Sequence, residues 1–167
     1  MQEWSPLLEE LVKDSIDLTM VRLHITHLTT LSPRGSSALH YAVLSGDYHA
    51  VEYLLDHGAL VNKVNHQLES PLHWACQVGC VKIVTLLLAH KALLHITDLN
   101  GSTPLHWAAE NNFREIVALL LHHGATKGKK NSRGKTAYQV ARSHGSQSVI
   151  SFLRPSSPLS LLFAHLM

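Results

Sequence analysis

Apolar positions recur along the chain at a fixed interval of 33 residues. In three successive segments a leucine stands two residues after a serine or threonine, at Leu39, Leu72 and Leu105. The same interval relates a second apolar set further along each segment, Val51, Val84, Val117 and Ile150. A looser fourth copy begins at Thr136. A period kept over four units predicts a stack of repeats.

Each unit predicts a short first helix. A hydroxyl side chain that can cap the free N–H groups of a helix start precedes every apolar run, at Ser37, Ser70, Thr103 and Thr136. Pro71 and Pro104 follow at the first helical position, where a missing N–H costs nothing. Gln139 stands three residues after Thr136 and predicts a capping box in the fourth unit. Residues that tolerate a left-handed backbone mark the expected helix ends, namely Gly46, Gly79, Asn112 and Gly145.

A second helix is predicted in each unit. In the third unit its apolar stripe consists of Ile116, Val117, Leu120 and Leu121. Gly58 and Gly124 close this helix in the first and third units, whereas Lys91 holds that position in the second, where a non-glycine residue costs about 1 kcal/mol. Two short helices cannot bury their apolar faces alone, so stacked neighbours must complete the core.

The segment 98–125, with Thr103-Pro-Leu-His-Trp-Ala-Ala109 at its centre, resembles the ankyrin repeat family. The resemblance covers residues 32–154, as units 32–64, 65–97, 98–130 and 131–154. It implies an all-α solenoid of helix-turn-helix units joined by β-turn or hairpin loops. Residues 1–31 are expected to form an N-terminal helical cap or a degenerate repeat, and residues 155–167 a C-terminal tail.

The resemblance also implies a function. It predicts a non-catalytic interaction module that binds a partner protein on its concave surface, as an adaptor or scaffold. The alternative is a stoichiometric inhibitor or a substrate-receptor subunit of a regulatory complex, such as a kinase or ubiquitin ligase assembly. The tail is too short for a ligase-recruiting box, and no kinase-inhibitor signature stands beside the repeat.

The expected partner-binding residues fall into three groups. The turn tips contribute Arg34, Ser36, His66, Gln67, Glu69, Leu99, Asn100, Ser102, Arg133 and Lys135. The first helices contribute Leu44, Ser45, Gln77, Val78, Glu110 and Asn111. A column at the interval of 33 residues, near the end of each second helix, consists of His57, His90 and His123. If these imidazoles are exposed, they would gain charge below about pH 6.5 and make binding pH-dependent.

Large aromatic residues form another column, Tyr41, Trp74 and Trp107. Aromatic side chains are favoured as interface anchors, which would place Trp74 and Trp107 in the partner site. The alternative, which we favour, is that they are framework residues packed between helices.

Composition narrows the class of partner. With 46% hydrophobic residues, 16% charged residues and a net charge of +2, the chain resembles neither a disordered protein nor a strongly basic nucleic-acid binder. A local basic cluster consists of Lys127, Lys129, Lys130, Arg133 and Lys135. It predicts a positive rim that steers an acidic partner, and the alternatives are a nuclear-localisation patch or a solvated loop.

The sequence predicts neither catalysis, nor a cofactor, nor a bound metal. His40, His73 and His106 lie inside the repeat motif, where each imidazole would satisfy backbone groups. The most zinc-like set of side chains is His73, Cys76 and Cys80. Gly79 is expected to end the helix before Cys80, so the three side chains would not lie on one helix face. The chain has neither a Gly-x-Ser-x-Gly nucleophile elbow nor a phosphate-binding loop.

The remaining expectations concern location and modification. Two cysteines make no disulfide framework, and the polar N-terminus does not read as a signal peptide. The apolar run 159–167 is too short to cross a bilayer. We therefore expect a cytoplasmic or nuclear monomer without membrane insertion. In the ankyrin family the turn asparagine corresponding to Asn62 can be hydroxylated by a dioxygenase, although an unmodified Asn62 is the simpler reading.

Overall fold

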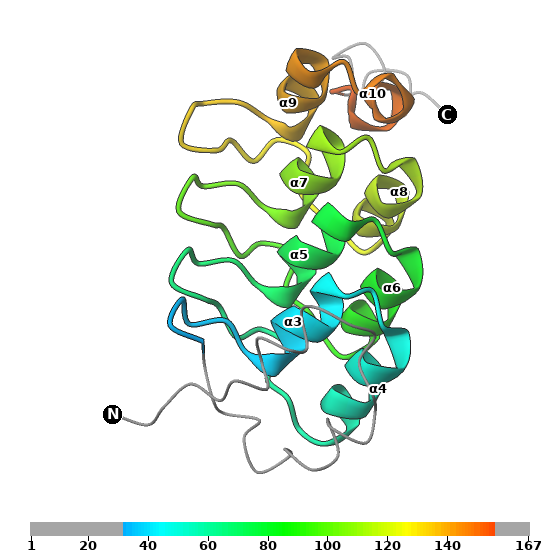
Figure 1. The fold of residues 1–167 in the computed structure, drawn as a ribbon. Helices are drawn as coiled ribbons and strands as arrows, with labels where there is room; N and C mark the ends of the chain where they lie inside the picture. The colour runs from blue at the N-terminus through cyan, green and yellow to red at the C-terminus, as the bar shows by residue number, and fades with distance from the viewer. Residues whose placement is uncertain (1–31, 156–167) are drawn as a thin grey trace.

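The computed structural model describes residues 32–155 of the chain, and within that range it contains eight helices in four consecutive pairs (Figure 1). The helices are α3 (Ala38–Leu44), α4 (Tyr48–Asp56), α5 (Pro71–Val78), α6 (Val81–Ala89), α7 (Pro104–Glu110), α8 (Arg114–His122), α9 (Ala137–His144) and α10 (Gln147–Leu153). The expectations for residues 1–31 and for the tail beyond Pro155 lie outside the described residues. The architecture is an all-α repeat solenoid.

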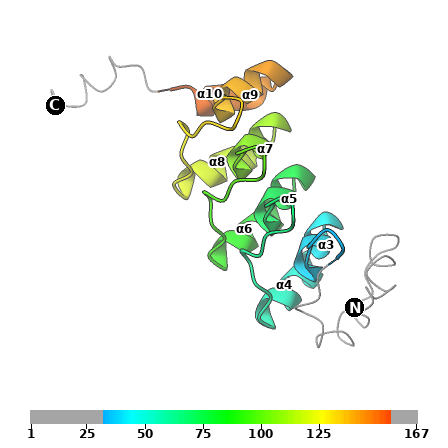
Figure 2. The ribbon, with the colours of Figure 1, turned by 90° about the vertical axis from the view of Figure 1, so that its left-hand side faces the viewer.

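The helices stack in two layers. The first helices of the units, α3, α5, α7 and α9, pack on one another in order, and so do the second helices, α4, α6, α8 and α10. Figures 1 and 2 show both columns, and Figure 1 shows the connecting hairpin loops extending from the layer of first helices. The loops therefore form a row along one side of the stack.

The periodic apolar residues form the core between the layers. Leu39, Leu72 and Leu105 are at most 1% exposed, and the corresponding second-helix valines are fully buried. Alanine follows each leucine by three residues, and these side chains, at most 3% exposed, allow the helices to approach closely: Ala42, Ala75 and Ala108. The predicted core is confirmed in the first three units, which repeat the same pattern of burial.

The helix starts follow the predicted capping. The Ser70 hydroxyl accepts the N–H of His73, and the Thr136 hydroxyl accepts the N–H of Gln139. All four first helices carry a capping box, with Gln139 as its second member in the fourth unit and a histidine in the other three. The histidine is a variation on the usual Glu or Gln.

The helix ends also follow the prediction. Lys91 has a φ of +66°, close to the left-handed backbone of Gly58 and Gly124 at the same position in the neighbouring units. Asn112 ends its first helix in the same conformation, with a φ of +61°. Both residues adopt a backbone that L side chains disfavour, so the repeat geometry overrides local preference there.

Candidate partner-binding surface

The four hairpin tips are closed by the same side-chain contact. In the third unit Asp98 Oδ1 accepts the N–H groups of Asn100 at 2.9 Å and of Ser102 at 2.8 Å. Its counterparts, which accept from the residues two and four positions later, are Ser32, Asn65 and Asn131. The signal, a short polar side chain every 33 residues, was present in the sequence and was missed. The contact holds each tip in one conformation.

Backbone hydrogen bonds join the tips into a continuous rim. The N–H of His66 donates to Arg34 O at 2.9 Å, and the N–H of Leu99 donates to Gln67 O at 3.0 Å. In the same way the N–H of Ser132 donates to Asn100 O at 2.8 Å. Because each tip is bonded to the next, the rim is a rigid, pre-organised surface.

Buried histidines tie the first helices to this rim. His40 Nε2 lies 3.0 Å from Glu69 O, and its Nδ1 lies 3.1 Å from the backbone nitrogen of Ser37. Since a carbonyl only accepts, Nε2 carries the proton and Nδ1 accepts the Ser37 N–H. His73 and His106 repeat both contacts, with Ser102 O and Lys135 O as their acceptors. The prediction that these imidazoles satisfy backbone groups is confirmed.

Burial keeps these imidazoles neutral. Desolvation lowers the pKa of His40 to about 4, although the hydrogen bond to Glu69 O opposes the shift. Burial also lowers the pKa values of His73 and His106. The three histidines are therefore structural links between units.

The tryptophans take part in the same framework. The indole N–H of Trp74 donates to the Glu69 carboxylate at 2.8 Å, and that of Trp107 donates to the Asp98 carboxylate at 3.0 Å. The Trp74 ring also packs edge-on against His40, with centroids 5.2 Å apart. Both tryptophans are half-buried. Their geometry supports the framework interpretation. The Glu69 carboxylate, expected to contact a partner, is hydrogen-bonded to Trp74 within the fold.

An exposed leucine at a strained position was missed by the sequence analysis. Leu68 has a φ of +59°, and the other three tips have glycine there with a φ between +69° and +76°. Its side chain is 43% exposed, and Leu99 on the next tip is 57% exposed. The substitution of leucine for a periodic glycine was the available signal. The rim thus carries apolar side chains at its second and third tips.

Most of the expected tip and first-helix residues reach the surface. The exposed ones are Arg34, Leu44, Ser45, His66, Gln67, Gln77, Leu99, Asn100, Glu110, Asn111 and Arg133, and the half-buried ones are Glu69, Val78, Ser102 and Lys135. The expectation of a surface-exposed Ser36 is wrong. Ser36 is 2% exposed, because its N–H bonds to Ser32 Oγ and its hydroxyl lies 3.5 Å from Asn65 Nδ2.

A comparison with protein families identifies the repeat. The family model described as ankyrin repeats (3 copies) matches residues 7–98 and 91–158. The chain belongs to the ankyrin repeat family. Ankyrin repeats are generally protein–protein interaction modules, and the family is typically non-catalytic. The comparison with curated proteins gave no significant match.

The histidine column lies on a different part of the ankyrin solenoid from the rim. His57, His90 and His123 are the C-caps of α4, α6 and α8, in the layer of second helices (Figure 2). The imidazole Nδ1 of His57 donates to Tyr53 O at 2.7 Å, and that of His123 donates to Leu119 O at 2.9 Å. These contacts cap their own helices. We expected these histidines to share one partner-binding surface with the hairpin tips. The structure corrects this, because they lie at the ends of the second helices.

The candidate metal ligands do not form a cluster in the part of the ankyrin stack that the structure describes. Between residues 32 and 155 no group of three or more His, Cys, Asp and Glu side chains could hold an ion. The Cys76 side chain is fully buried, which raises the pKa of its thiol, and Cys80 is the N-cap of α6. None of the helices in this range is long and apolar enough to cross a membrane.

Asn62 links two ankyrin units. Its Nδ2 donates to Lys91 O at 3.1 Å, and its Oδ1 accepts the N–H of Leu93 at 2.8 Å. The amide therefore holds the loop after α6 against the loop after α4. Hydroxylation of this half-buried residue stays a prediction.

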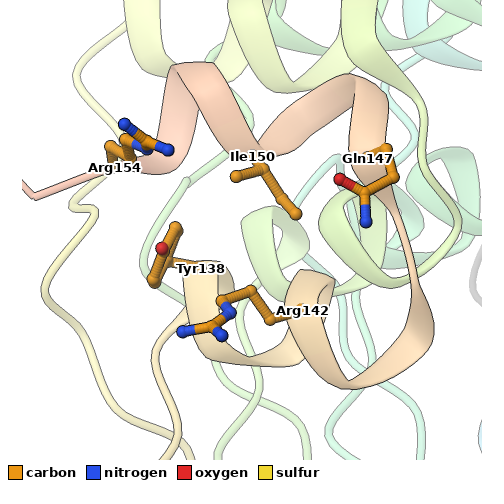
Figure 3. A pocket seen from close by; sticks show the side chains of 5 residues that line it. All are labelled: Tyr138, Arg142, Gln147, Ile150 and Arg154. Carbon is orange, nitrogen blue, oxygen red and sulfur yellow. The ribbon is translucent and has the colours of Figure 1, made fainter.

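The last ankyrin unit differs from the others on its outer face. Tyr138 and Arg142 replace the buried Leu105 and Ala109 of the third unit, where α9 covers α7. With Gln147, Ile150 and Arg154, they line a hollow between α9 and α10, and Figure 3 shows Tyr138 between the two arginines. The Arg142 guanidinium lies 5.9 Å from the centre of the Tyr138 ring. This polar face suits the end of a stack.

Proposed function

We propose that this ankyrin solenoid is a non-catalytic recognition module, an adaptor or scaffold, that binds a partner protein on its rim and first helices. One observation carries the proposal. The four hairpin tips form a single hydrogen-bonded row that exposes Leu68 and Leu99.

Rigidity supports this assignment. Each tip is closed by a side-chain acceptor and bonded to its neighbour, so little conformational entropy remains to be lost on binding. The exposed leucines offer apolar area, which supplies much of the binding energy at the centre of interfaces. Polar side chains around the leucines, such as Gln67 and Asn100, suit the polar periphery of a protein–protein interface.

A capture experiment with matched variants tests the proposal. The first variant combines Gln67→Ala, Gln77→Ala and Leu99→Ala, all exposed on the tips and first helices. The control combines Leu60→Ala, Lys82→Ala and Glu115→Ala, all exposed in the second-helix layer or in the loop that follows it. Proteins captured from cell lysate are quantified by mass spectrometry, after circular dichroism has established that both variants are folded.

We expect a defined set of partners to be lost from the first variant and retained by the control. Partners that the first variant keeps and the control loses would move the binding surface to the second helices. A wild-type protein that captures no partner above an unfolded control would contradict the function itself.

A further inference from the structure

Charge is distributed unevenly along the chain. Residues 1–115 contain seven lysines and arginines and twelve aspartates and glutamates, a net charge of −5. Residues 116–167 contain seven lysines and arginines and no acidic residue, a net charge of +7. Within the described residues, 32–115 contain five lysines and arginines and seven aspartates and glutamates, a net charge of −2. The near-neutral total of +2 therefore conceals a strongly basic C-terminal segment.

All seven of these cations belong to the fourth unit and the loop that leads into it. They are Lys127, Lys129, Lys130, Arg133, Lys135, Arg142 and Arg154, and together they define the C-terminal cationic surface. Six of the seven residues are exposed and Lys135 is half-buried. Across residues 32–155 the ion pairs are His49 with Glu52 and His144 with Glu110, so no carboxylate in this range forms an ion pair with the seven cations. Its field therefore extends into solvent.

We propose that the C-terminal cationic surface binds an acidic segment of the partner protein, an inference that rests on the proposed function. Two guanidinium groups flank the hollow of the end face, with Tyr138 and Ile150 beside them (Figure 3). A guanidinium binds a carboxylate through paired hydrogen bonds, and the tyrosine and isoleucine can contact the apolar stem of a glutamate. The hollow is thus suited to an acidic side chain.

The charge pattern favours an acidic protein segment over a nucleic acid. A strand of nucleic acid needs cations along its path and exposed aromatic faces for its bases. Here the cations are concentrated in the fourth unit and the loop that leads into it, with only five spread over residues 32–115. The second and third tips carry Glu69 and Asp98, whose carboxylates accept the indole N–H groups of the tryptophans. A protein can present carboxylates to the fourth unit and apolar side chains to Leu68 and Leu99.

The test uses a short fluorescent peptide of glutamate, serine and leucine as the probe. The main variant of the full chain combines Lys127→Gln, Lys129→Gln and Arg133→Gln. The matched control removes the same charge from the first two units through Lys63→Gln, Lys82→Gln and Lys91→Gln. A further variant, Arg142→Gln with Arg154→Gln, tests the hollow. Fluorescence anisotropy measures affinity at about 50 and 200 mM salt, over which exposed charges become increasingly screened.

We expect the peptide to bind the wild type more tightly at low salt, and the main variant to bind about tenfold more weakly. The control should stay within about twofold of wild type, and the paired arginine variant should lose affinity too. Equal losses in the main variant and the control would overturn the proposal. So would equal binding of a peptide with glutamine in place of glutamate, or tighter binding of oligothymidine of matched charge.

The two proposals fail separately. A captured partner that depends on Gln67, Gln77 and Leu99 but binds the main variant as well as the wild type would overturn only the acidic-segment inference. A wild type that captures no protein would overturn the proposed function, whatever the peptide result.

Discussion

At the scale of single residues, the buried histidines couple folding to pH. His40 is held neutral by burial, and its protonated form would set a new N–H at Nδ1 against the N–H of Ser37. Its pKa is lowered from 6.5 to about 4 in the folded state. Between these values the unfolded chain binds the proton and the folded chain does not. Stability from this group is therefore complete above pH 6.5 and is lost as the pH falls towards 4.

We expect the free energy of unfolding to fall as the pH is lowered from 6.5 to 4, with His40 alone contributing on the order of 3 kcal/mol. Urea denaturation at several pH values measures this. The control is His40→Gln, because Gln139 occupies the corresponding position in the fourth unit and accepts the Thr136 N–H at 2.9 Å. A wild type with constant stability, or a His40→Gln variant with the same slope as wild type, would contradict the assignment.

Leu68 gives a second prediction at this scale. Leu68→Gly should raise the free energy of unfolding by up to about 1 kcal/mol, since glycine adopts the left-handed backbone without strain. The same change should weaken partner binding, because it removes an exposed apolar side chain from the rim. Leu68→Ala is the matched variant, which loses the side chain but keeps the strain. A destabilised Leu68→Gly protein with unchanged partner binding would show that the leucine serves the fold.

At the scale of the element, the core leucines set the stability of each helix pair. Leu105 is 1% exposed on α7, between its neighbours in the stack. Leu105→Ala should lower the free energy of unfolding by about 2–5 kcal/mol through the cavity that it leaves. Chemical denaturation measures the loss, and Leu60→Ala, at a residue 68% exposed, should have a small effect. Equal losses in the two variants would contradict the assigned core.

The second unit should be less stable than the third. It contains two residues with a strained left-handed backbone, Leu68 and Lys91, whereas the third unit contains one, Asn112. Because repeat stabilities are nearly additive, we expect amide hydrogens of α5 and α6 to exchange faster than those of α7 and α8. Hydrogen exchange followed by mass spectrometry measures both units in one experiment. Better protection of α5 and α6 would refute this ranking.

The elements were largely predictable because their signals are local and repeated. Caps such as Ser70, helix-end residues such as Lys91 and core leucines such as Leu105 each act within one helix and recur at a constant interval. The surface was less predictable, because it depends on how tips stack. Ser36 is turned inward by a neighbouring unit, and His57 lies in the layer of second helices. Leu68 could have been recognised in the sequence as a leucine where the other three tips have glycine, but the structure was needed to show its left-handed backbone and exposure.

At the scale of the whole molecule, positive charge is concentrated at one end of the stack. Residues 32–115 of the described solenoid have a net charge of −2, and the cationic surface lies at its C-terminal end. A partner with an acidic and an apolar region would therefore bind in a single orientation, with its acidic region at the fourth unit. Leu68 and Leu99 would contact its apolar region.

Site-specific photo-crosslinking in cells would show directly whether a partner protein contacts the rim. In one protein p-benzoylphenylalanine replaces Leu99, 57% exposed on the rim, and in the other it replaces Leu60, 68% exposed in the loop after α4. Binding on the rim and first helices predicts that position 99 crosslinks to a defined partner protein and position 60 does not. A partner crosslinked from position 60 and not from position 99 would contradict it.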